Sequence, residues 1–90
     1  MRLDMFLKVS RLVKRRSVAK ELCDKGRVHV GGSSAKAGRE VKPGDVIALR
    51  LPRRKVTAEI LETPTGNVTK ERAATLYRII EDTALTEELF

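Results

Sequence analysis

The chain has 90 residues, of which 34% are charged and 3% aromatic, and its formal net charge is +7 at pH 7. A chain of this length builds one small hydrophobic core with little room for a deep substrate cavity, so we expect a single domain that is not an enzyme. No apolar run approaches the ~20 residues of a membrane span, and the N-terminus has no signal peptide pattern; together these predict a cytoplasmic protein without a membrane partner.

Two helices are predicted in the N-terminal part of the chain. Apolar side chains recur at helical spacing along residues 1–14, which predicts a first helix with Asp4 and Lys8 paired weakly on its exposed face. A second helix is expected to begin with Ser17 as its N-cap and to end before Gly26. The link between the two helices is so short that they should form a tight helical hairpin.

Beyond Gly26 the apolar period changes from 3.6 to 2, which indicates strands. The predicted strands are 27–30, 46–51 and 56–61. Residues 42–45 (Lys-Pro-Gly-Asp) have the composition of a type II turn, and residues 63–67 are a loop of helix and strand breakers. From Thr69 we expect a third helix, with the last eight residues frayed. Its predicted apolar face is Ala73, Leu76, Tyr77 and Ile80.

These elements predict an α+β fold in which the helical hairpin packs on a small, twisted, mainly antiparallel sheet and a C-terminal helix covers the sheet. The side chains expected in the core are Leu3, Phe6, Leu7, Leu22, Val28, Val30, Ile47 and Leu49.

The sequence offers no catalytic or metal-binding motif. Cys23 lies in the apolar stripe of the second predicted helix, where a free cysteine is most simply a small core residue. With His29 as the only histidine, the chain cannot supply the four ligands of a zinc site. It also contains no phosphate-binding glycine loop and no nucleophile–base arrangement, so we expect no cofactor.

The charges are divided unevenly along the chain. Residues 1–55 hold 16 Lys and Arg against 5 Asp and Glu, a net charge of +11, whereas residues 56–90 have a net charge of −4. Such a basic lobe favours a polyanionic partner, RNA above all, with an anionic membrane surface or an acidic protein as alternatives. Because so few aromatic rings are present for base stacking, recognition of RNA shape and backbone is favoured.

The predicted RNA-binding residues lie in or beside the helical hairpin. The corner between the two helices combines three successive cations with a helix N-terminus, and both features favour phosphate. Since Arg is better suited than Lys to forked, bidentate contacts with phosphate, the first choices are Arg2, Arg15 and Arg16. The full predicted set is Arg2, Lys8, Arg11, Lys14, Arg15, Arg16, Ser17, Lys20 and Lys36.

The order of these motifs resembles the S-four RNA-binding domain over about residues 1–50. The motifs that carry the resemblance are Arg2-Leu3-Asp4, Phe6-Leu7, Ser17 with Leu22, Gly26-x-Val28-x-Val30 and Val41-Lys42-Pro43-Gly44-Asp45. Gly31-Gly32 replaces the usual Asn-Gly turn, and the alanine expected after Ser17 is displaced. The resemblance implies the alpha-L fold, with residues 1–62 as the RNA-binding domain and residues 63–90 as a loop and C-terminal helix completing it.

The short chain and its acidic tail are similar to the stand-alone members of this family that act in ribosome-associated quality control. The resemblance implies binding to obstructed large ribosomal subunits, with contacts to rRNA and peptidyl-tRNA, in support of a partner factor that adds a C-terminal alanine tail. The alternative is a heat-shock or assembly factor that binds large-subunit rRNA without a role in tailing, like the fifteen-kilodalton heat-shock protein. Away from the ribosome we expect a monomer.

Overall fold

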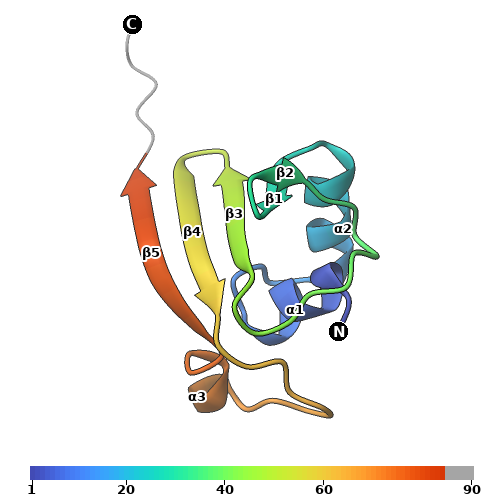
Figure 1. The fold of residues 1–90 in the computed structure, drawn as a ribbon, viewed down its shortest axis with the longest axis vertical. Coiled ribbons are helices and arrows are strands. Elements are labelled where there is room, and N and C mark those ends of the chain that lie inside the picture. Colours follow the sequence, from blue (N-terminus) through green and yellow to red (C-terminus); the bar gives the residue numbers. More distant parts are fainter. Residues whose placement is uncertain (85–90) are drawn as a thin grey trace, which may run out of the picture.

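The computed structural model describes residues 1–84, which form three helices and one antiparallel sheet (Figure 1). The elements are α1 (Leu3–Val9), α2 (Arg16–Asp24), β1 (Val28–Val30), β2 (Ser33–Ser34), β3 (Val46–Leu51), β4 (Arg54–Ile60), α3 (Lys70–Ala73) and β5 (Tyr77–Ala84). The strand order is β2-β1-β3-β4-β5. Helices α1 and α2 pack on one face of the sheet, so the predicted α+β fold with a helical hairpin on a small antiparallel sheet is confirmed.

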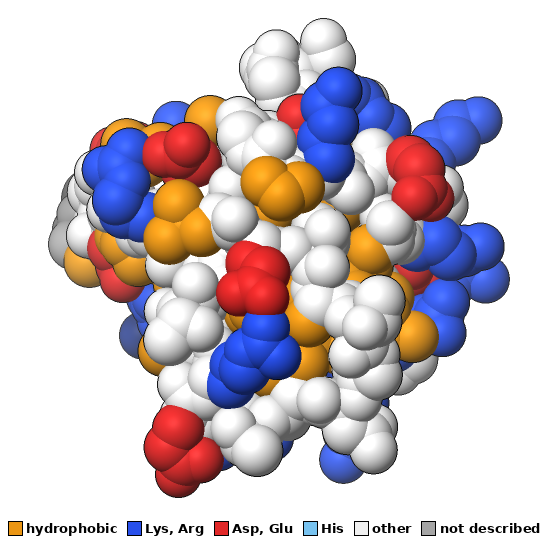
Figure 2. Space-filling model, turned by 60° about the horizontal axis from the view of Figure 1, so that its bottom comes forward, with side chains coloured by type: hydrophobic (Ala, Val, Ile, Leu, Met, Phe, Trp, Pro, Cys, Tyr) orange, Lys and Arg blue, Asp and Glu red, His pale blue; other side chains and the backbone are white. Residues whose placement is uncertain are grey.

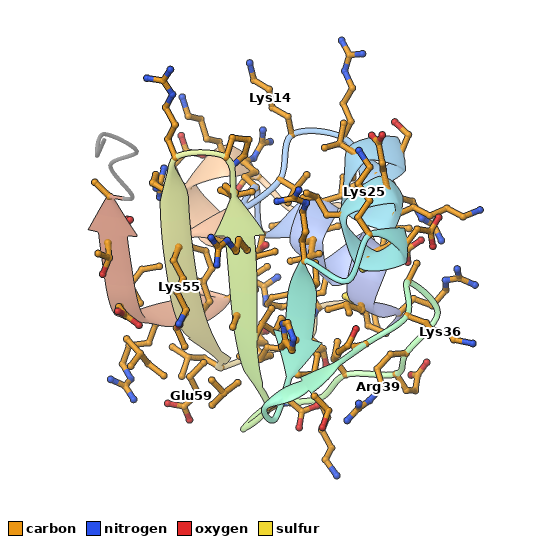
Figure 3. All side chains as sticks on the ribbon, turned by 90° about the horizontal axis from the view of Figure 1, so that it is seen from above. Lys14, Lys25, Lys36, Arg39, Lys55 and Glu59 are labelled. Carbon is orange, nitrogen blue, oxygen red and sulfur yellow. The ribbon has the colours of Figure 1, made fainter. Side chains whose placement is uncertain are left out.

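The strand alternation separates the two faces of the sheet. In β3, Ile47 and Leu49 are buried under the helices, whereas Ala48 and Arg50 point to the opposite side. No helix covers that opposite side in the described part of the chain, and we call it the outer face. Figure 3 views the sheet from this side, with Lys55 of β4 in front of the strand.

The core agrees with the prediction at seven of its eight positions. Phe6, Leu3 and Leu7 are fully buried and pack with the inward side chains of β1 and β3. Leu22 is the exception, because it is half-buried and only packs against the edge of the core. No helix among the described residues is long and apolar enough to cross a membrane.

The first helix is shorter than predicted, because it ends at Val9 rather than Lys14. Arg11 has a φ of 62°, a left-handed conformation that no continuing α-helix accepts. The chain then folds back, and the Val13 N–H donates to the Leu7 carbonyl at 3.1 Å while the Val13 side chain enters the core. The apolar spacing that predicted about five further helical residues therefore reflects the burial of Val13, which lies in a loop.

The second helix begins two residues earlier than predicted. Arg15 is the N-cap and its side chain makes no capping bond, so Ser17 lies inside the first turn and is not the cap. The predicted end is correct, since Gly26 follows the helix with a φ of 71°, the conformation that glycine adopts at low cost after a helix.

The predicted C-terminal helix is largely wrong. Thr69 caps α3 by accepting from the Arg72 N–H at 3.1 Å, but α3 has four residues and the chain then enters β5. Strand β5 pairs along its length with β4, whose edge would otherwise be open, and this tertiary pairing outweighs helix periodicity. Ile80, predicted on an apolar helix face, is 49% exposed. Of the residues expected to fray, Thr83 and Ala84 are paired with β4, and 85–90 lie outside the described residues.

Candidate nucleic-acid interface

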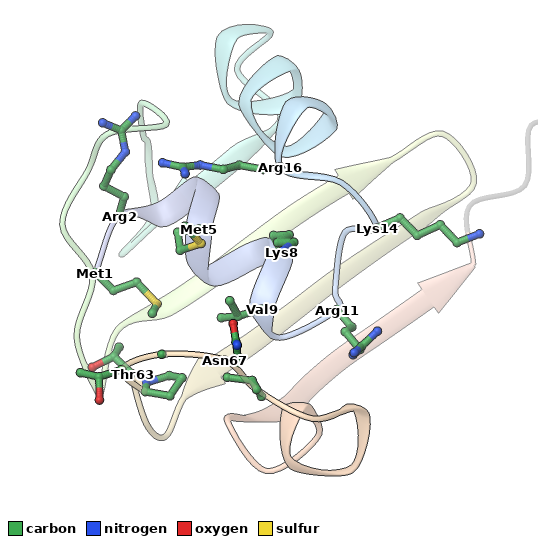
Figure 4. Close-up of a pocket in the computed structure, with 14 residues that line it drawn as sticks. Met1, Arg2, Met5, Lys8, Val9, Arg11, Lys14, Arg16, Thr63 and Asn67 are labelled. Atoms are coloured by element: carbon green, nitrogen blue, oxygen red, sulfur yellow. The ribbon is translucent and has the colours of Figure 1, made fainter.

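A groove of about 1020 Å³ lies between α1, the turn that follows it and the loop 63–68 (Figure 4). Five of the predicted RNA-binding side chains line it, and no Asp or Glu of residues 1–84 does. These five are Arg2, Lys8, Arg11, Lys14 and Arg16. The other side chains that line it are uncharged, and Val9 of α1 points toward Asn67 of the loop. The groove therefore offers a positive, partly apolar surface of the kind that attracts a phosphate backbone.

The local backbone sets the order of the cations along the groove. Figure 4 shows Arg2 and Arg16 at one end, Lys8 near the middle, and Arg11 and Lys14 at the other end. Helix α1 carries Lys8 on its exposed face because its opposite face is buried. The left-handed residue Arg11 ends the helix and turns the chain. The longer helix predicted over residues 1–14 would instead have distributed these cations along a single helix axis.

The second wall of the groove is the loop 63–68, which sequence reasoning did not include in the site. Pro64 is buried, and Gly66 has a φ of 81°, so the loop is a tight turn that presents no charge to the groove. In Figure 2, which brings this end of the molecule forward, apolar side chains are visible between the charged ones and Lys and Arg side chains gather along the right-hand margin. Residues 63–68 carry no charged side chain, so charge clustering in the sequence could not identify this wall as part of the site.

One buried carboxylate organises the end of the groove. The Asp4 side chain is 3% exposed; Arg2 Nε donates to its Oδ1 and Arg16 Nε to its Oδ2, each at 3.2 Å. The Met5 N–H also donates to Oδ1 at 2.8 Å. The predicted position of Asp4 on the exposed face, paired with Lys8, is therefore wrong. Arg2 Nη2 also donates to Oδ2 at 3.5 Å. Both arginine side chains are nevertheless about half exposed, so part of each side chain remains accessible from solvent.

The other predicted residues lie outside the groove. Arg15 and Ser17 are exposed at the beginning of α2, and Lys20 is exposed one turn further on. Lys36 lies in the loop after β2 (Figure 3), away from the groove. Within the described residues the structure brings together five of the nine predicted side chains.

Burial raises the pKa of Asp4, but the hydrogen bonds and charges of Arg2 and Arg16 lower it more, so its net pKa lies below the ordinary value. The paired carboxylate thus stabilises the fold at any pH above its unfolded pKa of about 3.9, and the contribution disappears as the pH falls through the lower folded pKa.

Burial also raises the pKa of the Cys23 thiol to about 11, so the thiol stays protonated at neutral pH. No group of three possible metal ligands occurs within residues 1–84.

Asp4→Asn is expected to lower the free energy of unfolding at pH 7 by about 1.5–3 kcal/mol, the range for hydrogen bonds to charged groups. Urea unfolding at pH 7, 5 and 3 would measure this, and the difference from the parent should shrink at pH 3. Glu40→Gln is the control, since Glu40 pairs with the N-terminal amino group on the surface and its loss should cost within about 0.5 kcal/mol. A pH-independent effect of Asp4→Asn would contradict the assigned role of the carboxylate.

Comparison with known proteins gives a consistent picture. Residues 1–47 match the S4 domain family. A Bacillus subtilis protein named "RQC P-site tRNA stabilizing factor" is 47% identical over 87 residues, which cover 97% of this chain and 100% of that protein. A protein of the same name from Streptococcus pneumoniae is 43% identical over 89 residues, covering 99% of this chain and 100% of the relative.

Solved structures show the same fold. A trimeric structure of heat shock protein 15 from Vibrio cholerae superposes with a TM-score of 0.81 at 33% identity, covering 88% of this chain and 80% of that one. The solution structure of a hypothetical protein gives a TM-score of 0.72 at 39% identity over 98% of this chain and all of the other.

Proposed function

The chain belongs to the S4 domain family, and from this membership and its groove we propose that it is a non-catalytic RNA-binding factor of ribosome-associated quality control. In this role it binds large ribosomal subunits that are obstructed by peptidyl-tRNA and holds the tRNA in the P site. The name of its bacterial relatives, "RQC P-site tRNA stabilizing factor", supports this assignment, since the similarity extends over almost the whole chain.

The observation that carries the proposal is the charge of the groove. Five cations and no carboxylate of the described residues line it, and its volume is about 1020 Å³. Each phosphate that such a surface neutralises releases counterions, which gives RNA affinity with little sequence readout. A factor that recognises the shape of tRNA beside rRNA needs this kind of contact.

The finer steps are part of the same proposal. We propose that the factor contacts large-subunit rRNA as well as the tRNA, and that it supports a partner factor which adds alanine residues to the stalled chain. It acts in the cytoplasm and without a cofactor. Residues 1–62 contribute the RNA-binding surface, and residues from 63 onward complete the same domain by adding α3, β5 and the second wall of the groove.

A second candidate is a heat-shock or assembly factor on the large subunit. The likeness to heat shock protein 15, with a TM-score of 0.81, favours it, because the two chains share the same fold. The two candidates differ in whether peptidyl-tRNA is required for binding.

Co-sedimentation of the full chain with purified large subunits, with and without peptidyl-tRNA in the P site, tests the proposal. The parent should bind the tRNA-carrying subunits at least about tenfold more tightly. Lys8→Gln/Lys14→Gln removes two groove cations that take part in no ion pair of the described residues. This variant should lower the slope of log affinity against log salt by about 1.4–1.8, the value for two phosphates.

Lys42→Gln/Lys70→Gln is the matched control, since it removes the same charge from two exposed sites outside the groove. It should retain the parent's affinity within about twofold. Equal binding to subunits with and without peptidyl-tRNA would favour the assembly factor, and equal losses in the two variants would remove the groove from the interface.

A further inference from the structure

Three cations stand side by side on the outer face of the sheet. Arg50 of β3 lies directly opposite Lys55 of β4, and the Arg50 N–H donates to the Arg27 carbonyl at 2.8 Å, which places Arg27 opposite Arg50 on its other side. All three side chains are exposed. Because neighbouring strands lie about 4.8 Å apart, the three Cα positions span only about 10 Å. We call this set, Arg27, Arg50 and Lys55, the outer cation row.

The row faces away from the helices. The residues adjacent in sequence, Val28, Leu49 and Val56, are buried on the helix side, so alternation directs the row to the outer face. Figure 3 shows Lys55 on this side of β4. Since α1 lies on the opposite side of the sheet, the row and the groove cannot both contact one short stretch of the same partner.

No carboxylate of the described residues lies within ion-pair distance of the row; the nearest one on the same face is Glu81 of β5, which lies opposite Thr57 and accepts from the Thr83 hydroxyl at 3.0 Å. Arg54, the neighbour of Lys55, makes a bidentate ion pair with Asp82, and Arg78 pairs with Glu59 further along the same strands. None of the three row residues takes part in such a pair in residues 1–84. Like charges placed directly opposite in a sheet are destabilising, so this arrangement is unfavourable unless an anion lies across it.

The surroundings of the row favour RNA over an acidic protein. The next positions on the same face are His29, Ala48 and Thr57, which supply no large aliphatic side chain and no benzene or indole ring. Protein interfaces are built around such apolar and aromatic anchors, whereas phosphate contacts need mainly cations and accessible surface. Arg53 in the turn between β3 and β4 extends the positive charge beyond the end of the sheet.

We propose that the outer cation row is a second RNA-binding surface, which takes the sugar-phosphate backbone of an RNA segment other than the one in the groove. The protein then bridges two RNA elements, one on each side of its sheet. This inference rests on the proposed function, which includes contacts to both tRNA and rRNA, and deepens it by giving the second RNA contact a surface separate from the groove. Bivalent contact would raise the overall affinity well above that of either surface, because the second contact forms within the same complex.

The test uses the full chain with Arg50→Gln/Lys55→Gln, which removes two charges of the row while keeping long polar side chains. The probes are purified bacterial large ribosomal subunits and protein-free large-subunit rRNA. Affinity for both probes should fall about tenfold at 150 mM salt, with a loss of about 1.4–1.8 in the salt slope. The urea unfolding midpoint should stay equal to the parent's or rise, since two opposed like charges are gone.

Lys42→Gln/Lys70→Gln again serves as the charge-matched control and should bind both probes within about twofold of the parent. Unchanged affinity of Arg50→Gln/Lys55→Gln for both probes would overturn the inference. A loss on intact subunits with none on protein-free rRNA would assign the row to a ribosomal protein and also overturn it. Lys8→Gln/Lys14→Gln tests the groove separately. If this variant binds RNA like the parent while Arg50→Gln/Lys55→Gln loses affinity, the groove is refuted as an RNA-binding surface and the outer cation row is retained.

Discussion

Replacing Arg2 and Arg16 together by alanine is expected to weaken binding to tRNA-carrying large subunits by about a hundredfold or more. Both guanidinium groups are held on the Asp4 carboxylate at 3.2 Å and reach the same end of the groove. Side chains that are already positioned lose little conformational entropy when they bind phosphate. At about 1.5–3 kcal/mol for each charge-assisted hydrogen bond, the loss of one contact from each arginine amounts to two or more orders of magnitude.

The same variant also affects folding, because it leaves the buried Asp4 carboxylate with the Met5 N–H as its remaining described partner. We therefore expect a lower unfolding temperature for Arg2→Ala/Arg16→Ala as well. Adding Asp4→Asn removes the orphaned charge and should recover stability without recovering RNA binding. Binding is measured by co-sedimentation at a temperature at which circular dichroism shows each variant to be folded.

Arg78→Ala is the control for this experiment. Arg78 makes an exposed pair with Glu59 at 2.7 Å on β5, away from the groove, and its loss should leave the affinity nearly unchanged. Undiminished binding by the folded Arg2/Arg16 variant would mean that the end of the groove does not contact RNA. Equal losses from Arg78→Ala would mean that only net charge matters.

The elements predicted well from the sequence are those whose residues contact near neighbours in the chain. The strand over Val46–Leu51 was predicted with the correct bounds, because alternation and the preceding turn act locally. The end of α2 at Gly26 has a similarly local cause. The errors occurred where a distant partner decides the conformation. Strand β5 forms because β4 offers a free edge, and no pattern within residues 77–84 reveals that edge.

The site was predicted in part for the same reason. Charge clustering identifies the helical hairpin, but which cations share a groove depends on the early end of α1 and on the loop 63–68. Asp4 is the clearest case. Single-sequence reasoning places a charged residue on the exposed face, whereas closure of the hairpin brings Arg16, twelve residues away, onto the same carboxylate as Arg2. The spacing of Asp4 and Arg16 in the sequence does not reveal how close the folded hairpin brings their side chains.

The groove depends on the packing of one side chain, that of Phe6. Phe6→Ala is expected to lower the free energy of unfolding by about 3–5 kcal/mol, the usual cost of truncating a buried phenylalanine. Phe6 is fully buried, its N–H donates to the Arg2 carbonyl and its carbonyl accepts from the Ser10 N–H, each at 2.9 Å. A domain of 90 residues has a total stability of about 5–13 kcal/mol at 0.05–0.15 kcal/mol per residue, so this one change removes a large share of it.

Helix α1 has only seven residues and cannot persist without that packing, since isolated helices of this length are unstable in water. The loss of Phe6 should therefore release Arg2 and Lys8 from the groove wall together, and RNA affinity should fall in step with folding. Urea unfolding measures the effect, with Phe6→Leu expected to cost under about 1.5 kcal/mol. Ile80→Ala, at a side chain that is 49% exposed, should cost less than about 1 kcal/mol. If Phe6→Ala changes the stability by no more than Ile80→Ala does, α1 is not held by the core and the groove must be formed in another way.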